Sequence, residues 1–204
     1  MRRSRDILGV MSRDLSMSFP MHPARVHEAY GPAAPVLAAV ACGQVEGSLF
    51  WISENWLPER LNPLGLSTFL DPARLLTART GSQIDSLAIA EETLRDGSLG
   101  LVVLETTRPL NLREGRRLQL AAKAGGTPGL CIIPEGMGSN AAETRWKAEP
   151  LPSLGSRDST LMRWDLKKNK SGTLGAWDVR WDAETRRLHV VSPAKASCKF
   201  FSVS

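Results

Sequence analysis

Residues 84–104 have the sequence IDSLAIAEETLRDGSLGLVVL, and this stretch decides the class of fold. Between Ile84 and Leu94 the apolar side chains recur at the spacing of one face of an α-helix. Gly97 supplies a C-terminal stop for this helix, and the apolar run over residues 99–104 predicts a buried β-strand. A helix that leads into a buried strand is typical of an α/β protein with a mainly parallel sheet.

The flanking sequence repeats this alternation. Residues 48–53 (SLFWIS), 74–78 and 128–133 (PGLCII) predict further buried strands. Residues 112–124 (LREGRRLQLAAKA) predict an amphipathic helix with Leu112, Leu118 and residues 120–122 facing inward. The polar residues 134–143 after the last of these strands predict a surface loop.

Beyond residue 152 the period of the pattern changes to two. Met162, Trp164 and Leu166 alternate with charged residues, and so do Trp177, Val179 and Trp181. This pattern predicts an antiparallel meander with one apolar and one charged face. We therefore expect a mobile N-terminal tail (1–24), for which a DNA-binding arm is the alternative, an α/β core (25–152), the meander (153–192) and a C-terminal tail (193–204).

Composition sets the range of partners. The chain of 204 residues carries a formal net charge of +5. Residues 144–187 contain ten Lys or Arg against six Asp or Glu, so most of the excess lies there. Such a surplus permits binding to nucleic acid, acidic proteins or anionic lipid. No segment reaches the ~18 apolar residues that cross a bilayer, so we expect a cytoplasmic protein without a membrane partner.

Phosphate-binding chemistry is incomplete in this sequence. The motif G-x-x-x-x-G-K-[ST] holds phosphates with backbone amides, a lysine and a hydroxyl. Residues 31–37 (GPAAPVL) occupy the corresponding strand-to-helix junction, but they lack the lysine and the hydroxyl. Gly31 and Pro32, together with Glu105 after the strand over 99–104, therefore form at most a degenerate nucleotide site. Glu105 as a solvated strand-end carboxylate is the simpler interpretation.

Catalytic and metal chemistry is not indicated elsewhere. The three histidines and three cysteines show no metal-ligand spacing, and no G-x-S-x-G motif is present. We expect no enzymatic activity, no catalytic residue, no metal and no cofactor, with ATP and Mg²⁺ as the alternative.

Basic and aromatic residues are interleaved in the last third of the chain. These residues are Arg145, Trp146, Lys147, Lys167, Lys168 and Lys170. Single-stranded nucleic acid is bound by cations that contact phosphates and by flat rings that stack on bases. We therefore predict modest, electrostatic binding of single-stranded DNA, with Trp146 as the exposed ring. Alternatively, the other tryptophans form the buried face of the meander and the charges only solvate its outer face.

A series of short segments resembles the ImuA family, relatives of the RecA recombinase in bacterial mutagenesis cassettes. In chain order they are VHEAYGP (26–32), LNPLGL (61–66), LDPARLL (70–76), EETLR (91–95), RRLQLAA (116–122) and TRW (144–146). The resemblance covers roughly residues 25–190, and it depends on the order and spacing of the segments together.

This resemblance implies a RecA-like fold and an accessory role in SOS-induced translesion DNA synthesis. The implied partners are an ImuB-like polymerase homologue and RecA, and residues 134–143 lie where RecA-like proteins place a DNA-contacting loop. The missing lysine departs from nucleotide-binding relatives and favours a non-catalytic adaptor. Two alternatives remain open, a DNA-stimulated RecA-type ATPase built around Glu105 and a SulA-like inhibitor of cell division.

Overall fold

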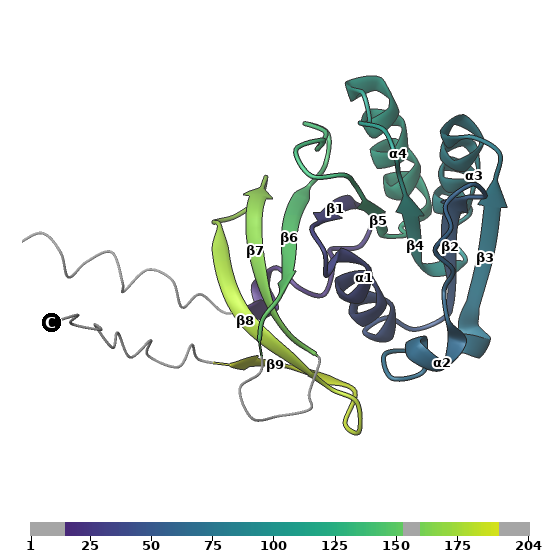
Figure 1. Ribbon diagram of the computed structural model, residues 1–204. Coiled ribbons are helices and arrows are strands. Elements are labelled where there is room, and N and C mark those ends of the chain that lie inside the picture. Colours follow the sequence, from purple (N-terminus) through teal and green to yellow (C-terminus); the bar gives the residue numbers. More distant parts are fainter. Residues whose placement is uncertain (1–14, 153–159, 192–204) are drawn as a thin grey trace, which may run out of the picture.

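The computed structural model describes residues 15–152 and 160–191. Within them a single sheet has the strand order β3-β2-β4-β5-β1-β6-β7-β8-β9 (Figure 1). The strands are β1 (Val26–Tyr30), β2 (Ser48–Glu54), β3 (Leu75–Thr80), β4 (Leu99–Glu105), β5 (Gly129–Ile132), β6 (Thr144–Pro150), β7 (Leu161–Asn169), β8 (Gly175–Asp182) and β9 (Arg187–Val191). The helices are α1 (Ala34–Gly43), α2 (Pro63–Leu66), α3 (Gln83–Asp96) and α4 (Leu112–Gly125), with 3-10 turns at Leu15–Met17 and Pro72–Arg74.

The sheet has a parallel part and an antiparallel part that meet at β6. Strands β3, β2, β4, β5, β1 and β6 pair in parallel, and β6, β7, β8 and β9 pair antiparallel. The predicted α/β class, the mainly parallel sheet and the C-terminal meander are confirmed. Because β6 pairs with both β1 and β7, the meander continues the sheet and does not form a separate layer.

Local sequence signals begin and end the two long helices. Ser82 caps α3 by accepting from the backbone N–H of Asp85, and Gly97 ends it at a φ of +82°. Asn111 and Glu114 form a capping box at the start of α4. The helix and strand predicted from residues 84–104 are therefore confirmed as α3 and β4.

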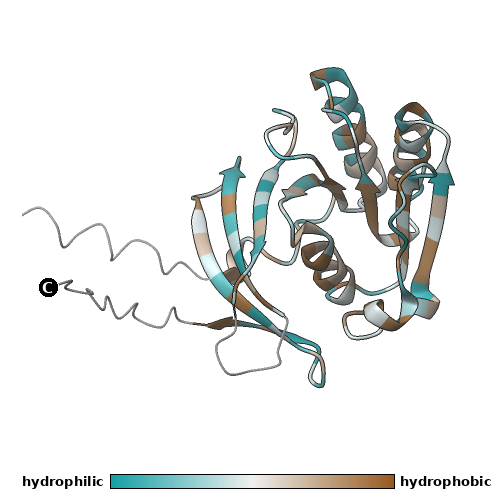
Figure 2. Cartoon of the chain, in the orientation of Figure 1, coloured by the Kyte–Doolittle hydropathy of each residue, from teal (hydrophilic) through white to brown (hydrophobic). Residues whose placement is uncertain are grey.

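Two hydrophobic cores lie on the two faces of the sheet. Along β4, Leu101 and Val103 pack on the side of α1, whereas Val102 and Leu104 pack on the side of α3 and α4. The sheet wraps around α1, because the core on that side joins residues of β2 and β4 to the tryptophans of the meander (Figure 1). The small and apolar residues of α1 are buried on nearly every side, and its ribbon is mostly hydrophobic (Figure 2).

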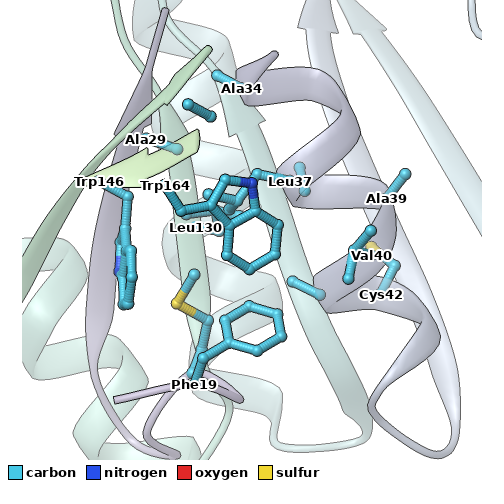
Figure 3. Packing of buried hydrophobic residues seen from close by; sticks show 14 of the residues in the cluster. Phe19, Ala29, Ala34, Leu37, Ala39, Val40, Cys42, Leu130, Trp146 and Trp164 are labelled. Carbon is cyan, nitrogen blue, oxygen red and sulfur yellow. The ribbon is translucent and has the colours of Figure 1, made fainter. Parts of the chain in front are cut away.

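The N-terminal segment departs from the expected mobile tail. Residues 1–14 lie outside the described part, but Leu15, Phe19 and Met21 are buried in the core around α1. The ring of Phe19 meets the indoles of Trp146 and Trp164 edge-on, with centroids 6.4 and 5.0 Å away (Figure 3). The expectation was wrong for residues 15–24, because three irregularly spaced apolar side chains fill the space between α1 and the meander.

The inward face predicted for α4 is also partly wrong. Leu118, Ala121 and Ala122 are buried, but Leu112 and Leu120 are 47% and 68% exposed. Successive residues of an α-helix are about 100° apart, so Leu120 lies about 160° from Leu118 around the axis. Both leucines therefore lie outside the stripe that packs on the sheet.

Candidate functional site

The connection between β1 and α1 occupies the place of a phosphate-binding loop. Residues 31–33 join the two elements, so the later positions of the eight-residue phosphate-binding motif, counted from Gly31, lie inside α1. Gly31 has a φ of +93°, and a Cβ atom there would lie 2.6 Å from the carbonyl oxygen of Ala148 in β6. The N–H of Ala33 donates to this oxygen at 3.1 Å, and the N–H of Ala34 donates to the oxygen of Gly31 at 3.0 Å. Two amides that could face a phosphate are thus used within the protein.

The first turn of α1 is adapted to packing. Pro35 has no N–H to donate, and Leu37 is fully buried in the core around α1. Counted from Gly31, the motif places its second glycine at Val36, its lysine at Leu37 and its serine or threonine at Ala38. The side chains of this turn therefore present neither a cation nor a hydroxyl.

Two carboxylates lie at the carboxyl edge of the parallel strands. Glu105 ends β4, two strands from β1, which corresponds to roughly 10 Å. The indole Nε1 of Trp51 donates to Glu105 Oε1 at 2.5 Å. Burial raises the pKa of Glu105, opposed by the Trp51 hydrogen bond and the charge of Arg79. On β2, Glu54 accepts from Thr107 Oγ1 at 2.7 Å. Both carboxylates thus anchor neighbouring elements.

A buried carboxylate organises the connection between β5 and β6. Glu28 of β1 is 1% exposed, and it accepts from the backbone N–H of Ser139 at 2.8 Å and from Arg145 Nε at 2.7 Å. Arg145 also donates to the carbonyl oxygen of Ser139 at 2.7 Å. Arg145 therefore holds this connection in place through Glu28 and Ser139. Its side chain is 22% exposed, so its charge also reaches the surface.

Lys168 and Lys170, two of the candidate DNA-binding lysines, also hold the connection between β5 and β6. Lys168 Nζ donates to the carbonyl oxygen of Asn140 at 2.8 Å, and Lys170 Nζ donates to that of Ala141 at 2.6 Å. The structure therefore brings Arg145, Lys168 and Lys170 together around residues 138–141. Met137 and Asn140 are exposed, whereas Ser139 and Ala141 are buried, so this stretch is only in part the surface loop that its composition predicted.

The other two candidate lysines lie in a lattice of ion pairs on the outer face of the sheet. Lys147 Nζ is 2.8 Å from a carboxylate oxygen of Glu149, and Lys167 Nζ is 2.9 Å from one of Asp165. A carboxylate beside each cation lowers the attraction of this face for phosphates.

Trp146 is buried, contrary to the prediction that its ring is exposed. Its side chain is 0% exposed, because alternation along β6 directs it into the core with Trp164 and Trp177. It cannot stack on a base without unfolding this core.

The indole of Trp146 begins a buried hydrogen-bond chain. Trp146 Nε1 donates to Thr144 Oγ1 at 2.9 Å, and this hydroxyl is 2.7 Å from His27 Nδ1. His27 Nε2 must be the donor to the carbonyl oxygen of His22 at 3.1 Å, so Nδ1 accepts from Thr144. Burial lowers the pKa of His27 from 6.5 to about 4, which keeps the ring neutral.

Sequence reasoning missed Glu28 and His27, although a signal was available. Both lie in the short strand VHEAY, and both are flanked by residues of a buried strand. A carboxylate and an imidazole in such a strand need partners, since an unpaired buried polar group is costly. The partners, Arg145 and Thr144, are more than one hundred residues away in the sequence.

No protein-family model matches the sequence, and no curated protein matches it. Among solved structures, the protein is similar to the crystal structure of the RadB recombinase, with a TM-score of 0.63 and 15% sequence identity. The similarity covers 84% of this chain and 92% of that chain. The fold is RecA-like. At this identity the similarity establishes the fold alone, which confirms the fold class expected from the resemblance.

Within this RecA-like fold, Gly31, Pro32 and Glu105 lie at the carboxyl edge of the parallel strands, where open α/β sheets bind ligands. Over residues 15–152 and 160–191, no three His, Cys, Asp or Glu side chains gather as a metal site would require. No helix in the same ranges is long and apolar enough to cross a bilayer.

Proposed function

We propose that this chain is a non-catalytic adaptor of SOS-induced translesion DNA synthesis. It would act in the cytoplasm beside an ImuB-like polymerase homologue and RecA. The RecA-like fold and the ordered ImuA-like segments support this role. These segments coincide with β1 and its connection to α1, with α2, with the entry to β3, with α3 and α4, and with the start of β6.

The observation that carries the non-catalytic part is the connection between β1 and α1. Its amides are bonded to Ala148 and Gly31, and a Cβ at Gly31 has no room. A nucleotide triphosphate needs amides that converge on its phosphates and a lysine that neutralises them. Here the Ala33 amide would have to leave the carbonyl oxygen of Ala148 before it could contact a phosphate.

A direct contact with single-stranded DNA is a second part of the proposal. Arg145, Lys168 and Lys170 surround residues 138–141, in the region where the resemblance implies a DNA-contacting loop. Because aromatic stacking by Trp146 is blocked by burial, affinity would come from phosphate contacts alone and would fall steeply with salt.

A mutagenesis assay in a deletion strain tests the adaptor role. Full-length chain should restore damage-induced mutation frequency, and it should co-purify with RecA and the ImuB-like protein from damaged cells. Unchanged mutation frequency on deletion, or retention of neither partner, would count against the role.

Turnover of ATP separates the adaptor from the ATPase alternative. We expect no hydrolysis above a buffer blank, with or without single-stranded DNA and with RecA as the positive control. Hydrolysis that Glu105→Gln abolishes would replace the adaptor by an enzyme. Filamentous growth on overexpression without the mutagenesis partners would instead support inhibition of division.

A further inference from the structure

A groove lies between α4 and the connection from β5 to β6, which curls beside this helix (Figure 1). We call it the α4 groove, and its volume is about 480 Å³. Leu112, Arg116 and Leu120 of α4 line one side, and Asn140, Ala141 and Lys170 line the other. None of these residues belongs to the degenerate nucleotide site.

Close packing fixes the shape of the α4 groove. At Gly115 a Cβ atom would lie 2.6 Å from Ser139 Oγ and 2.9 Å from Ala141 Cβ, so the helix and the connection touch. Gln119, on the floor, donates to the carbonyl oxygen of Val26 at 2.7 Å and accepts from its N–H at 3.2 Å. The groove is therefore preformed, which lowers the entropic cost of filling it.

The α4 groove exposes aliphatic surface that the fold does not use. Leu112 and Leu120 are 47% and 68% exposed, although the sequence pattern predicted both to face inward. They flank Arg116 along the stripe of α4 that faces the groove. Burying these side chains against apolar groups of a partner would be favourable.

The charges of the α4 groove are positive. Its lining residues include Arg116 and Lys170 and no carboxylate. Lys170 is held by the carbonyl oxygen of Ala141, and Arg116 has no ion-pair partner in the described ranges. A complementary ligand would therefore combine apolar side chains with carboxylates.

We propose that the α4 groove binds an acidic amphipathic segment of a partner protein. A large apolar side chain of this segment would pack between Leu112 and Leu120, and its carboxylates would pair with Arg116 and Lys170. This inference deepens the proposed adaptor role and rests on it for its biological meaning, because an adaptor needs such a docking site.

Other occupants fit the α4 groove less well. A bilayer surface cannot enter a hollow between a helix and a loop. Single-stranded DNA would pair with the cations through its phosphates, but it would leave the exposed aliphatic side chains of Leu112 and Leu120 without apolar partners. A second copy of this chain would bring a net charge of +5 to a groove that is already basic.

Selection of peptides by the intact protein tests the α4 groove directly. Random peptides displayed on phage are selected on the full-length chain, and the enriched peptides are measured by fluorescence anisotropy. We expect enriched sequences that combine Asp or Glu with Leu, Ile, Phe or Trp. Leu120→Ser and Arg116→Glu should each weaken their binding by about tenfold or more.

Matched variants outside the α4 groove control for the loss of an exposed leucine and for the reversal of an exposed charge. Leu64→Ser removes a leucine that is 81% exposed on α2, and Arg113→Glu reverses an exposed charge of α4 that does not line the groove. Both should leave peptide binding unchanged, and all four variants should keep the native melting temperature, since the substituted side chains are exposed.

Three outcomes would overturn the proposal. These are no enrichment, enrichment of basic or neutral peptides, and peptides that bind Leu120→Ser and Arg116→Glu as tightly as the native protein. Binding of an oligonucleotide that depends on Arg116 but not on Leu120 would identify nucleic acid as the occupant instead. Because the selection uses the purified protein, its result is distinguishable from that of the mutagenesis assay.

Discussion

Replacing Glu28 by glutamine should destabilise the protein well beyond what a surface charge change does. The Glu28 carboxylate is buried, and its two oxygens accept from Ser139 N–H and from Arg145 Nε. A glutamine has the same shape and can still accept from Ser139. Its amide N–H₂, however, would face the donors of Arg145 and leave that guanidinium without its carboxylate.

The size of the effect follows from these contacts. A hydrogen bond to a charged group contributes about 1.5–3 kcal/mol, and breaking a buried ion pair costs about 3–5 kcal/mol. Arg145 is 22% exposed, so water compensates part of the loss. We therefore expect Glu28→Gln to lower the free energy of unfolding by about 2–4 kcal/mol. Amide hydrogens over residues 138–141 should also exchange faster, because Glu28 and Arg145 hold this stretch.

Urea unfolding followed by circular dichroism measures the change, and Glu149→Gln is the matched control. Glu149 forms a 2.8 Å ion pair with Lys147, but its side chain is 41% exposed. This control should change the free energy of unfolding by less than about 1 kcal/mol. The reasoning is refuted if Glu28→Gln is no more destabilising than the control.

Three further predictions concern the chain around β1 and the basic residues. Because His27 is neutral when folded, with its pKa lowered from 6.5 to about 4, the unfolded state binds more protons between these values. The free energy of unfolding should therefore fall by about 3 kcal/mol as pH drops from 6.5 to 4. If melting curves of the His27→Gln variant show an equal fall in the free energy of unfolding, the prediction is contradicted. Gly31→Ala should lower the free energy of unfolding by about 1–3 kcal/mol, because φ is +93° and the new Cβ meets the oxygen of Ala148; an unchanged urea midpoint would refute the close approach. Replacing Lys168 and Lys170 by glutamine should reduce the slope of log affinity for single-stranded DNA against log salt by about 1.4, since each phosphate contact contributes about 0.7. Equal slopes for the native and variant proteins would refute the contact.

Much of the fold follows from periodicity. The helix α3, with its serine cap and its terminal Gly97, and the strand β4 have complete local signals in residues 82–104. The meander over β7, β8 and β9 was predictable because apolar and charged side chains alternate along β7 and β8, and the antiparallel pairing of the three strands confirms it. Local patterns of this kind depend on residues that are close in the sequence.

The errors arise where distant packing decides. Phe19 is ordered by Trp146 and Trp164, and no local period marks it. Trp146 is buried, which the local pattern does not predict because its strand precedes the obvious alternation. Leu120 is a different kind of error, because its position about 160° from Leu118 around the helix axis, outside the buried stripe, follows from the sequence itself. The absence of the lysine and the hydroxyl can be read from the sequence, but the close approach of the Ala148 carbonyl to Gly31 cannot, because Ala148 lies in the distant strand β6.

The enclosure of α1 has an evolutionary consequence. Leu37 lies fully buried among the side chains around this helix. A mutation of Leu37 to lysine would bury an ammonium there, and a mutation of the neighbouring Ala38 to threonine would bury a hydroxyl, each at a cost of several kcal/mol unless a partner appeared at the same time. Random drift toward a phosphate-binding sequence is thus opposed at its first step by packing alone. Exposed positions carry no such cost, so sequence change in this protein should concentrate on its surface and not in this turn.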